Sequence, residues 1–168
     1  KIRVQQSASN IRMMELLGGA ATPIGSGEVY TALQQSVIDG AENNVLALTS
    51  NKHGDVCKYY SYTMHQMLPD IIIGNIRFLN SLSHEERAIF DEGFKIISKV
   101  QREAWGSSVE KAIEEAKKMN VEFIYPDVLA FQEKVLPLHK EVLDANPKLK
   151  PIYDRIQEIG KEVIGGKN

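Results

Sequence analysis

The sequence predicts an α/β fold, and three observations carry the prediction. Strand-like and amphipathic helical segments follow one another from residue 1 to about residue 45, which is an α/β pattern. The all-aliphatic run Ile71-Ile72-Ile73 has the character of a strand covered on both faces of a sheet. Apolar residues then keep helical spacing from His84 to Asn120, which indicates a helix longer than one small lobe needs.

The first elements follow from local patterns. Ile2 and Val4 alternate with charged neighbours, which predicts a short half-buried strand. A helix capped within residues 7–10 comes next, and Gly18-Gly19 ends it. The chain starts directly in this strand and without Met, so we expect it to be part of a longer protein whose other half holds part of the site.

Residues 25–44, GSGEVYTALQQSVIDGAENN, predict a helix, a tight turn and a pair of exposed amides. Ser26 is a candidate N-cap, and Glu28 in the first turn suits the helix dipole. Asp39-Gly40 signals the turn, and Asn43-Asn44 follows it. The pattern is typical of a ligand-binding edge in an α/β protein, and it is equally consistent with an ordinary surface turn.

The middle of the chain is less regular. Apolar spacing over residues 45–60 predicts a helix frayed near Gly54, followed by a β-prone segment from Tyr60 to Met67. Pro69-Asp70 breaks that segment, and the aliphatic residues 71–73 then predict a buried strand.

The long helix has a clear start. Ser83 and Glu86 have the spacing of a capping box. If positions 84–119 are continuous, the helix is roughly 54 Å long, whereas a compact chain of this length has a radius of gyration of about 15 Å. The helix therefore either breaks at Gly106-Ser107-Ser108 or runs as a spine across two lobes, as in a hinged receptor.

The last third predicts a strand at residues 121–125 and a helix that Asp127 caps, with a kink at Pro137. A connector and a final amphipathic helix through Ile152 and Val163 follow.

The composition excludes several classes of protein. The 168 residues carry a net charge of −2 and no block of basic residues, which argues against a nucleic acid or a membrane surface as partner. One cysteine, Cys57, excludes an intrachain disulfide, and the four histidines lack metal-ligand spacing. No catalytic or nucleotide-binding motif is present, so we expect no enzyme, metal or cofactor.

Arg3 is the strongest candidate for binding. A guanidinium is a rigid fork that matches a carboxylate in bidentate fashion. The alternative is a surface arginine that pairs with a nearby acidic side chain.

A family resemblance extends this interpretation. Lys1-Ile2-Arg3-Val4, GEVYTALQ at 27–34 and DGAEN at 39–43, with the long helix and Tyr125-Pro126-Asp127, resemble the solute receptors of TRAP transporters, of the dicarboxylate-receptor (DctP) type. The resemblance covers residues 1 to about 140. It implies part of a two-lobed periplasmic-binding-protein-like fold, with a long spine helix, that traps an organic acid outside the cytoplasmic membrane and delivers it to a membrane permease.

The resemblance also assigns roles to single residues. Arg3 matches the arginine that clamps the ligand carboxylate, and Asn43 matches an amide that contacts the same part of the ligand. Ser7 and His65 match polar positions that face the cleft. Ser26 stands where many relatives have an aromatic residue, which implies a wider or more polar pocket, suited to a sugar acid as much as to a plain dicarboxylate. The ligand-binding residues we expect are Arg3, Ser7, Ser26, Asn43 and His65.

The same resemblance suggests a division of the chain. Residues 1–66 would form the second ligand-binding lobe, 67–107 the return to the first lobe with the start of the spine, and 108–168 the rest of the spine, a strand and the C-terminal helices. If the first lobe is absent, its exposed apolar contact surface would favour association with another chain. Two alternatives remain: a sensory or scaffolding module of the same fold that docks on a membrane signalling partner, and an enzyme using His65 with a carboxylate.

Overall fold

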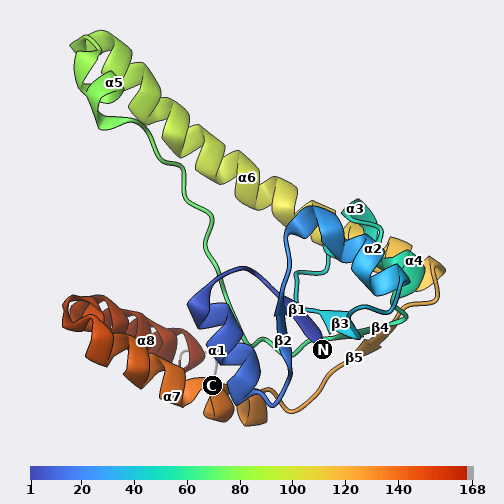
Figure 1. Ribbon diagram of the computed structural model, residues 1–168. Helices are drawn as coiled ribbons and strands as arrows, with labels where there is room; N and C mark the ends of the chain where they lie inside the picture. Colours follow the sequence, from blue (N-terminus) through green and yellow to red (C-terminus); the bar gives the residue numbers. More distant parts are fainter. Residues whose placement is uncertain (166–168) are drawn as a thin grey trace.

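The structure, a computed structural model, describes residues 1–165 and consists of a mixed α/β body and a long projecting arm (Figure 1). The body holds all five strands, and we use "arm" for residues 67–107. The α/β fold class predicted from the sequence is confirmed.

A three-stranded parallel sheet lies at the centre of the body. Its order is β2 (Ala21–Pro23), β1 (Ile2–Val4), β3 (Gly40–Ala41). Arg3 of β1 lies opposite Thr22 on one side and Ala41 on the other. The predicted first strand is therefore confirmed, and because all three strands are parallel, their carboxyl ends meet at one edge of the sheet.

Helix α1 (Ala8–Leu16) connects β1 to β2. The Ser7 side chain accepts a hydrogen bond from the Asn10 backbone N–H at 3.3 Å, which caps the helix as predicted. Gly18 ends the helix with a φ of +88°, a conformation that a residue with a Cβ rarely adopts.

The next crossover corrects one prediction. A 3₁₀ turn, η1 (Ser26–Glu28), leads into α2 (Val29–Gln34). Gly25 is the cap residue of η1, and the Ser26 side chain makes no capping hydrogen bond. Ser26 is thus not an N-cap, because the helix begins with a tight turn in which Ser26 already has helical backbone.

A second, two-stranded parallel sheet pairs β4 (Tyr59–Ser61) with β5 (Glu122–Ile124). Tyr60 and Phe123 of these strands pack against a cluster of buried residues, Val45, Leu48, Ala116 and Val121. The prediction of one helix over residues 45–60 is wrong, because this segment is not continuous. It is two single turns, α3 (Ala47–Ser50) and α4 (His53–Val56), because Lys52 between them has a left-handed φ of +58°.

The β-prone segment after β4 is also shorter than predicted. The strand ends at Ser61, and the Thr63 N–H turns back to the Ser61 carbonyl at 2.9 Å. Met64, with a φ of +47°, then prevents the strand from continuing.

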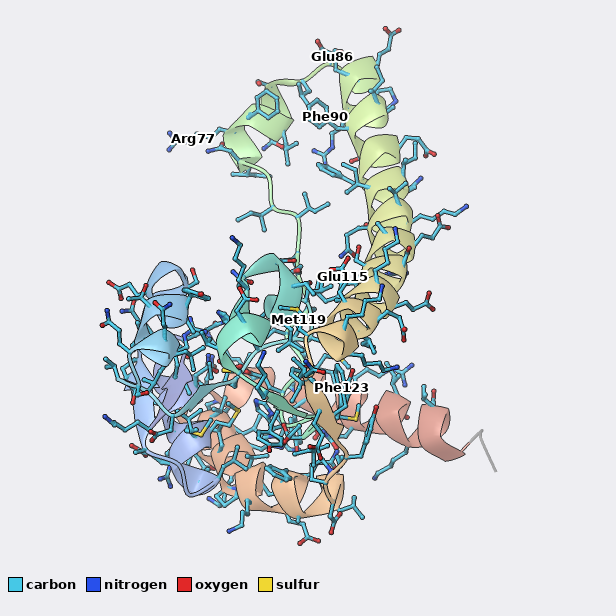
Figure 2. The ribbon with its side chains drawn as sticks, turned by 90° about the vertical axis from the view of Figure 1, so that its right-hand side faces the viewer. Arg77, Glu86, Phe90, Glu115, Met119 and Phe123 are labelled. Carbon is cyan, nitrogen blue, oxygen red and sulfur yellow. The ribbon has the colours of Figure 1, made fainter. Side chains whose placement is uncertain are left out.

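Helix α6 (His84–Lys118) is continuous through residues 106–108, so of the two alternatives that the sequence left open, the break does not occur. Its 35 residues span about 52 Å, and both hydrogen bonds of the Ser83–Glu86 capping box are present. Figure 2 shows Glu86 at the far end of the helix and Phe90 near it, on the side that faces α5 (Ile76–Ser81), whereas Met119 and Phe123 lie in the body. The helix thus spans from the body to the tip of the arm.

Residues 71–73 do not form the predicted buried strand. They lie in an extended stretch without strand pairing, and their side chains are 77%, 56% and 82% exposed. Nothing in the described part of the chain packs over them, so the aliphatic run has no sheet to join.

Two helices close the described chain. Asp127 caps α7 (Val128–Ala145) by accepting from the Leu129 N–H at 3.0 Å, as predicted, and Pro137 lies within this helix. The 3₁₀ turn η2 (Pro147–Leu149) leads into α8 (Lys150–Gly165). Among residues 1–165, no helix combines the length and apolar character needed to cross a membrane.

Candidate functional site

The candidate site lies at the carboxyl edge of the three-stranded sheet. Arg3 is in β1 itself, and Ser7 follows that strand. Ser26 follows β2, and Asn43 follows β3. Parallel strands present such residues at one edge, where α/β sheets commonly bind ligands. Four of the five residues expected from the sequence therefore lie on or just beyond strands that end at this edge.

Two contacts hold Arg3, whose side chain is buried. Its Nε donates to the Ile24 carbonyl at 3.0 Å, just beyond β2. Its Nη1 lies 4.0 Å from Glu42 Oε1, just beyond β3. The residue is 5% exposed, so the guanidinium is fixed by both neighbouring strands and is not a freely moving surface group.

Glu42 was missed in the sequence analysis, although it lies within the DGAEN segment. Burial raises the pKa of its carboxyl, and the nearby Arg3 charge opposes that rise. Glu42 Oε1 is buried and has no hydrogen-bond partner among residues 1–165. The acid therefore faces Arg3 as a loose ion pair at 4.0 Å, which leaves the guanidinium able to form shorter bonds to another carboxylate.

The other polar residues near the strand ends are neutral. Asn43 is exposed, and its Oδ1 accepts from the Asn44 N–H at 2.8 Å. Its backbone carbonyl accepts from the Tyr60 hydroxyl at 3.2 Å. Burial raises the pKa of Tyr60 to about 12, so this phenol stays protonated and can donate. Ser26 is exposed, and Ser7 is half-buried at its helix cap.

His65 lies in the segment that follows β4, and β4 belongs to the two-stranded sheet. Its Nδ1 is 2.5 Å from Thr63 Oγ1, while its Nε2 is buried without a partner among the described residues. Burial lowers the pKa of the ring, which favours the neutral form. A neutral imidazole with one free nitrogen can donate or accept one further hydrogen bond.

A chain of amides links the His65 segment to the first sheet. Gln66 Nε2 donates to Asn10 Oδ1 at 2.9 Å, and Asn10 Nδ2 donates to Gln5 Oε1 at 3.5 Å. Asn10 is 4% exposed. The sequence did not predict a role for these residues, because amides at positions 5, 10 and 66 form no recognisable motif.

His53 is another buried polar residue that the sequence did not single out. It is 6% exposed at the start of α4, and burial, followed by the charge of Arg3, lowers its pKa. It lines a cavity of about 430 Å³ together with Asn43, Tyr60 and both strands β3 and β4. Of the five expected site residues, Asn43 alone lines this cavity.

The chemistry of the site is that of binding. Within residues 1–165 there is no group of three side chains placed to hold a metal ion. The edge instead offers one fixed cationic fork and several neutral donors, a set suited to a carboxylate that carries hydroxyl groups.

Comparison with known proteins supports the family resemblance. Residues 1–146 match the family described as bacterial extracellular solute-binding protein, family 7. A TRAP periplasmic solute-binding protein from Anaerococcus prevotii, solved with bound D-glucuronate, is 60% identical, with a TM-score of 0.91 over 96% of this chain and 52% of that one.

Two further relatives are more distant. A TRAP periplasmic solute-binding protein from Xanthobacter autotrophicus with bound β-D-galacturonate is 36% identical, with a TM-score of 0.88 over 94% of this chain and 52% of that chain. An uncharacterized protein, YiiZ, of Salmonella typhimurium is 40% identical over 158 residues, which are 94% of this chain and 48% of that protein. The chain thus spans about half the length of the relatives it matches.

Proposed function

This chain belongs to the bacterial extracellular solute-binding proteins of family 7, and we propose that it supplies one lobe of a TRAP transporter receptor for a sugar acid. The receptor would work outside the cytoplasmic membrane, binding its solute without chemical change and delivering it to the membrane permease. This proposal includes the division into a lobe at residues 1–66, a return segment at 67–107 and a remainder at 108–168.

The proposed solute is a uronic acid or a similarly hydroxylated acid. The Anaerococcus and Xanthobacter relatives hold glucuronate and galacturonate. Ser26 supports the same choice, because a small exposed hydroxyl at the edge leaves room for a pyranose ring and can bond to its hydroxyl groups.

In the proposed binding mode, Arg3 donates two hydrogen bonds to the solute carboxylate. The Ile24 carbonyl and Glu42 hold the guanidinium in place beforehand, which lowers the entropy lost on binding. Ser7, Ser26, Asn43 and neutral His65 would bond to the solute hydroxyls. Closure of the first lobe over this one would remove water and strengthen the Arg3–carboxylate contact.

The buried and doubly held Arg3 carries the proposal, and a thermal-shift experiment tests it. In the complete natural protein that carries this sequence, D-glucuronate or D-galacturonate should raise the melting temperature, whereas D-glucose should not. A solute at 100 times its Kd stabilises the folded state by about 2.7 kcal/mol.

Arg3→Lys is the informative variant, because it keeps a cation beside Glu42 but loses the fork and the Nε bond. We expect the uronate-induced shift to disappear, and the melting temperature without solute to fall moderately because the Ile24 carbonyl loses its donor. Arg12→Lys is the matched control, since Arg12 pairs with Glu141 on the surface. A full shift in Arg3→Lys would refute the role of Arg3.

A further inference from the structure

His65 follows a strand of the two-stranded sheet, whereas Arg3 lies in the three-stranded sheet. The two can bind one solute only if the segment that carries His65 is held beside the other sheet. A hydrogen bond next to His65 makes this connection, because Gln66 Nε2 donates to Asn10 Oδ1 at 2.9 Å. Figure 1 shows this part of the chain, in green, leaving the body beside α1.

Asn10 lies in the first turn of α1, and α1 begins shortly after β1, at the carboxyl edge of the three-stranded sheet. Its side chain is buried, and its Nδ2 makes a longer contact to Gln5 Oε1 at 3.5 Å. Because a buried amide needs partners for both its oxygen and its nitrogen, this arrangement keeps the oxygen directed at Gln66. The hydrogen bond therefore places the segment after β4 at the edge that holds Arg3.

His65 is also held from the other side. Thr63 Oγ1 lies 2.5 Å from its Nδ1, and Met64 between them has a left-handed φ of +47°, so the chain turns tightly there. The remaining ring nitrogen, Nε2, is buried and has no hydrogen-bond partner among residues 1–165. Contacts at positions 63 and 66 thus flank the ring. A group that is fixed before binding loses less entropy when a solute binds than a mobile group does.

We propose that Asn10 is a positioning residue of the solute site. By accepting the hydrogen bond from Gln66, it keeps His65 at the edge that holds Arg3, where Nε2 bonds to a hydroxyl group of the sugar acid. Asn10 acts through His65 and does not touch the solute itself. The inference deepens the proposed function and rests on it, because it assigns a role in binding to a buried residue outside the five expected contacts.

Calorimetric titration of the complete natural protein with D-glucuronate tests this role. Asn10→Ala removes the acceptor of the hydrogen bond, and Gln66→Ala removes the donor at an exposed position, where the substitution leaves the core intact. We expect each variant to raise the Kd about fivefold, as for the loss of one hydrogen bond. Met13→Ala is the control, since Met13 is buried on the same helix and has no part in this hydrogen bond. It should lower stability and leave the Kd unchanged.

Two further measurements distinguish positioning from a purely structural effect. When His65→Ala is already present, adding Asn10→Ala should change the Kd by less than about twofold, because no ring remains to be positioned. NMR spectra without solute report on the ring itself, whose resonances are identified by their loss in His65→Ala. These resonances should shift in Asn10→Ala and in Gln66→Ala but not in Met13→Ala.

Three results would overturn the inference alone, provided that the natural protein binds D-glucuronate. They are an unchanged Kd in Gln66→Ala, losses of affinity from Asn10→Ala and His65→Ala that multiply in the double variant, and ring resonances that stay in place. If the natural protein binds neither D-glucuronate nor D-galacturonate, the proposed function is overturned as well.

Discussion

At the scale of single residues, Arg3 differs from an ordinary surface arginine in what surrounds it. Its guanidinium is held between Ile24 and Glu42, which belong to segments some 20 and 40 positions away in sequence. The pattern of strand and charge predicted a role for Arg3, but it could not reveal this pairing, because nonlocal contacts leave no local spacing. Glu42 was overlooked for that reason.

The buried histidines lead to a prediction about pH. Burial lowers the pKa of His65 below its ordinary value of about 6.5. As the pH falls below 6.5, the unfolded chain gains a proton that folded His65 does not, so the free energy of unfolding should fall until the pH reaches the folded pKa. Buried His53 contributes in the same direction.

Urea unfolding at pH 7.5, 6.5 and 5.5 measures this effect. His65→Gln should flatten the decline in unfolding free energy below pH 6.5. His84→Gln is the control, since His84 is exposed in the first turn of α6. An unchanged slope in His65→Gln would show that His65 does not titrate differently in the two states.

At the scale of elements, the sequence predicted the helix ends that depend on residues close together in the chain. The caps at Ser7, Ser83 and Asp127 and the continuous α6 depend on residues within a few positions of each other. The division of residues 45–60 depends on the left-handed Lys52, which the apolar spacing did not reveal. Ser26 failed as a cap because its turn is 3₁₀ and begins at Gly25.

The capping box of α6 gives a prediction at this scale. Ser83→Ala removes the acceptor for the Glu86 N–H, and a lost cap of this kind costs about 1 kcal/mol. Hydrogen exchange should quicken at the amides of residues 85–87 and stay unchanged at residues 112–118. Ser98→Ala in the middle of the helix, where the hydroxyl bonds only to the Phe94 carbonyl, should not quicken exchange at the helix start.

At the scale of the whole molecule, the arm exposes a large apolar surface. Exposed residues include Ile71, Ile73, Phe78, Ile89, Ile97, Val100 and Trp105. So many exposed large apolar side chains on one segment are unusual for a soluble monomer. The sequence could not show that residues 71–73 lack a covering partner among residues 1–165, since a hydrophobic run looks the same whichever segment buries it.

This surface predicts self-association of residues 1–168 by themselves. Sedimentation velocity should show a sedimentation coefficient that rises with protein concentration. Ile97→Glu with Val100→Glu should remove that dependence, because both side chains are about half exposed on the arm. Ser98→Glu with Gln101→Glu adds the same charge on neighbouring polar positions and should have less effect. A single monomeric species at all concentrations would contradict the prediction.

The central claim is that Arg3 binds the carboxylate of a sugar acid. A crystal structure of the complete natural protein with D-glucuronate tests it most directly. We predict that both carboxylate oxygens lie within about 3 Å of the Arg3 guanidinium, with Ser7, Ser26 or Asn43 bonded to the ring hydroxyls. A glucuronate whose carboxylate is bound by other residues, while Arg3 contacts only Ile24 and Glu42, would contradict the claim.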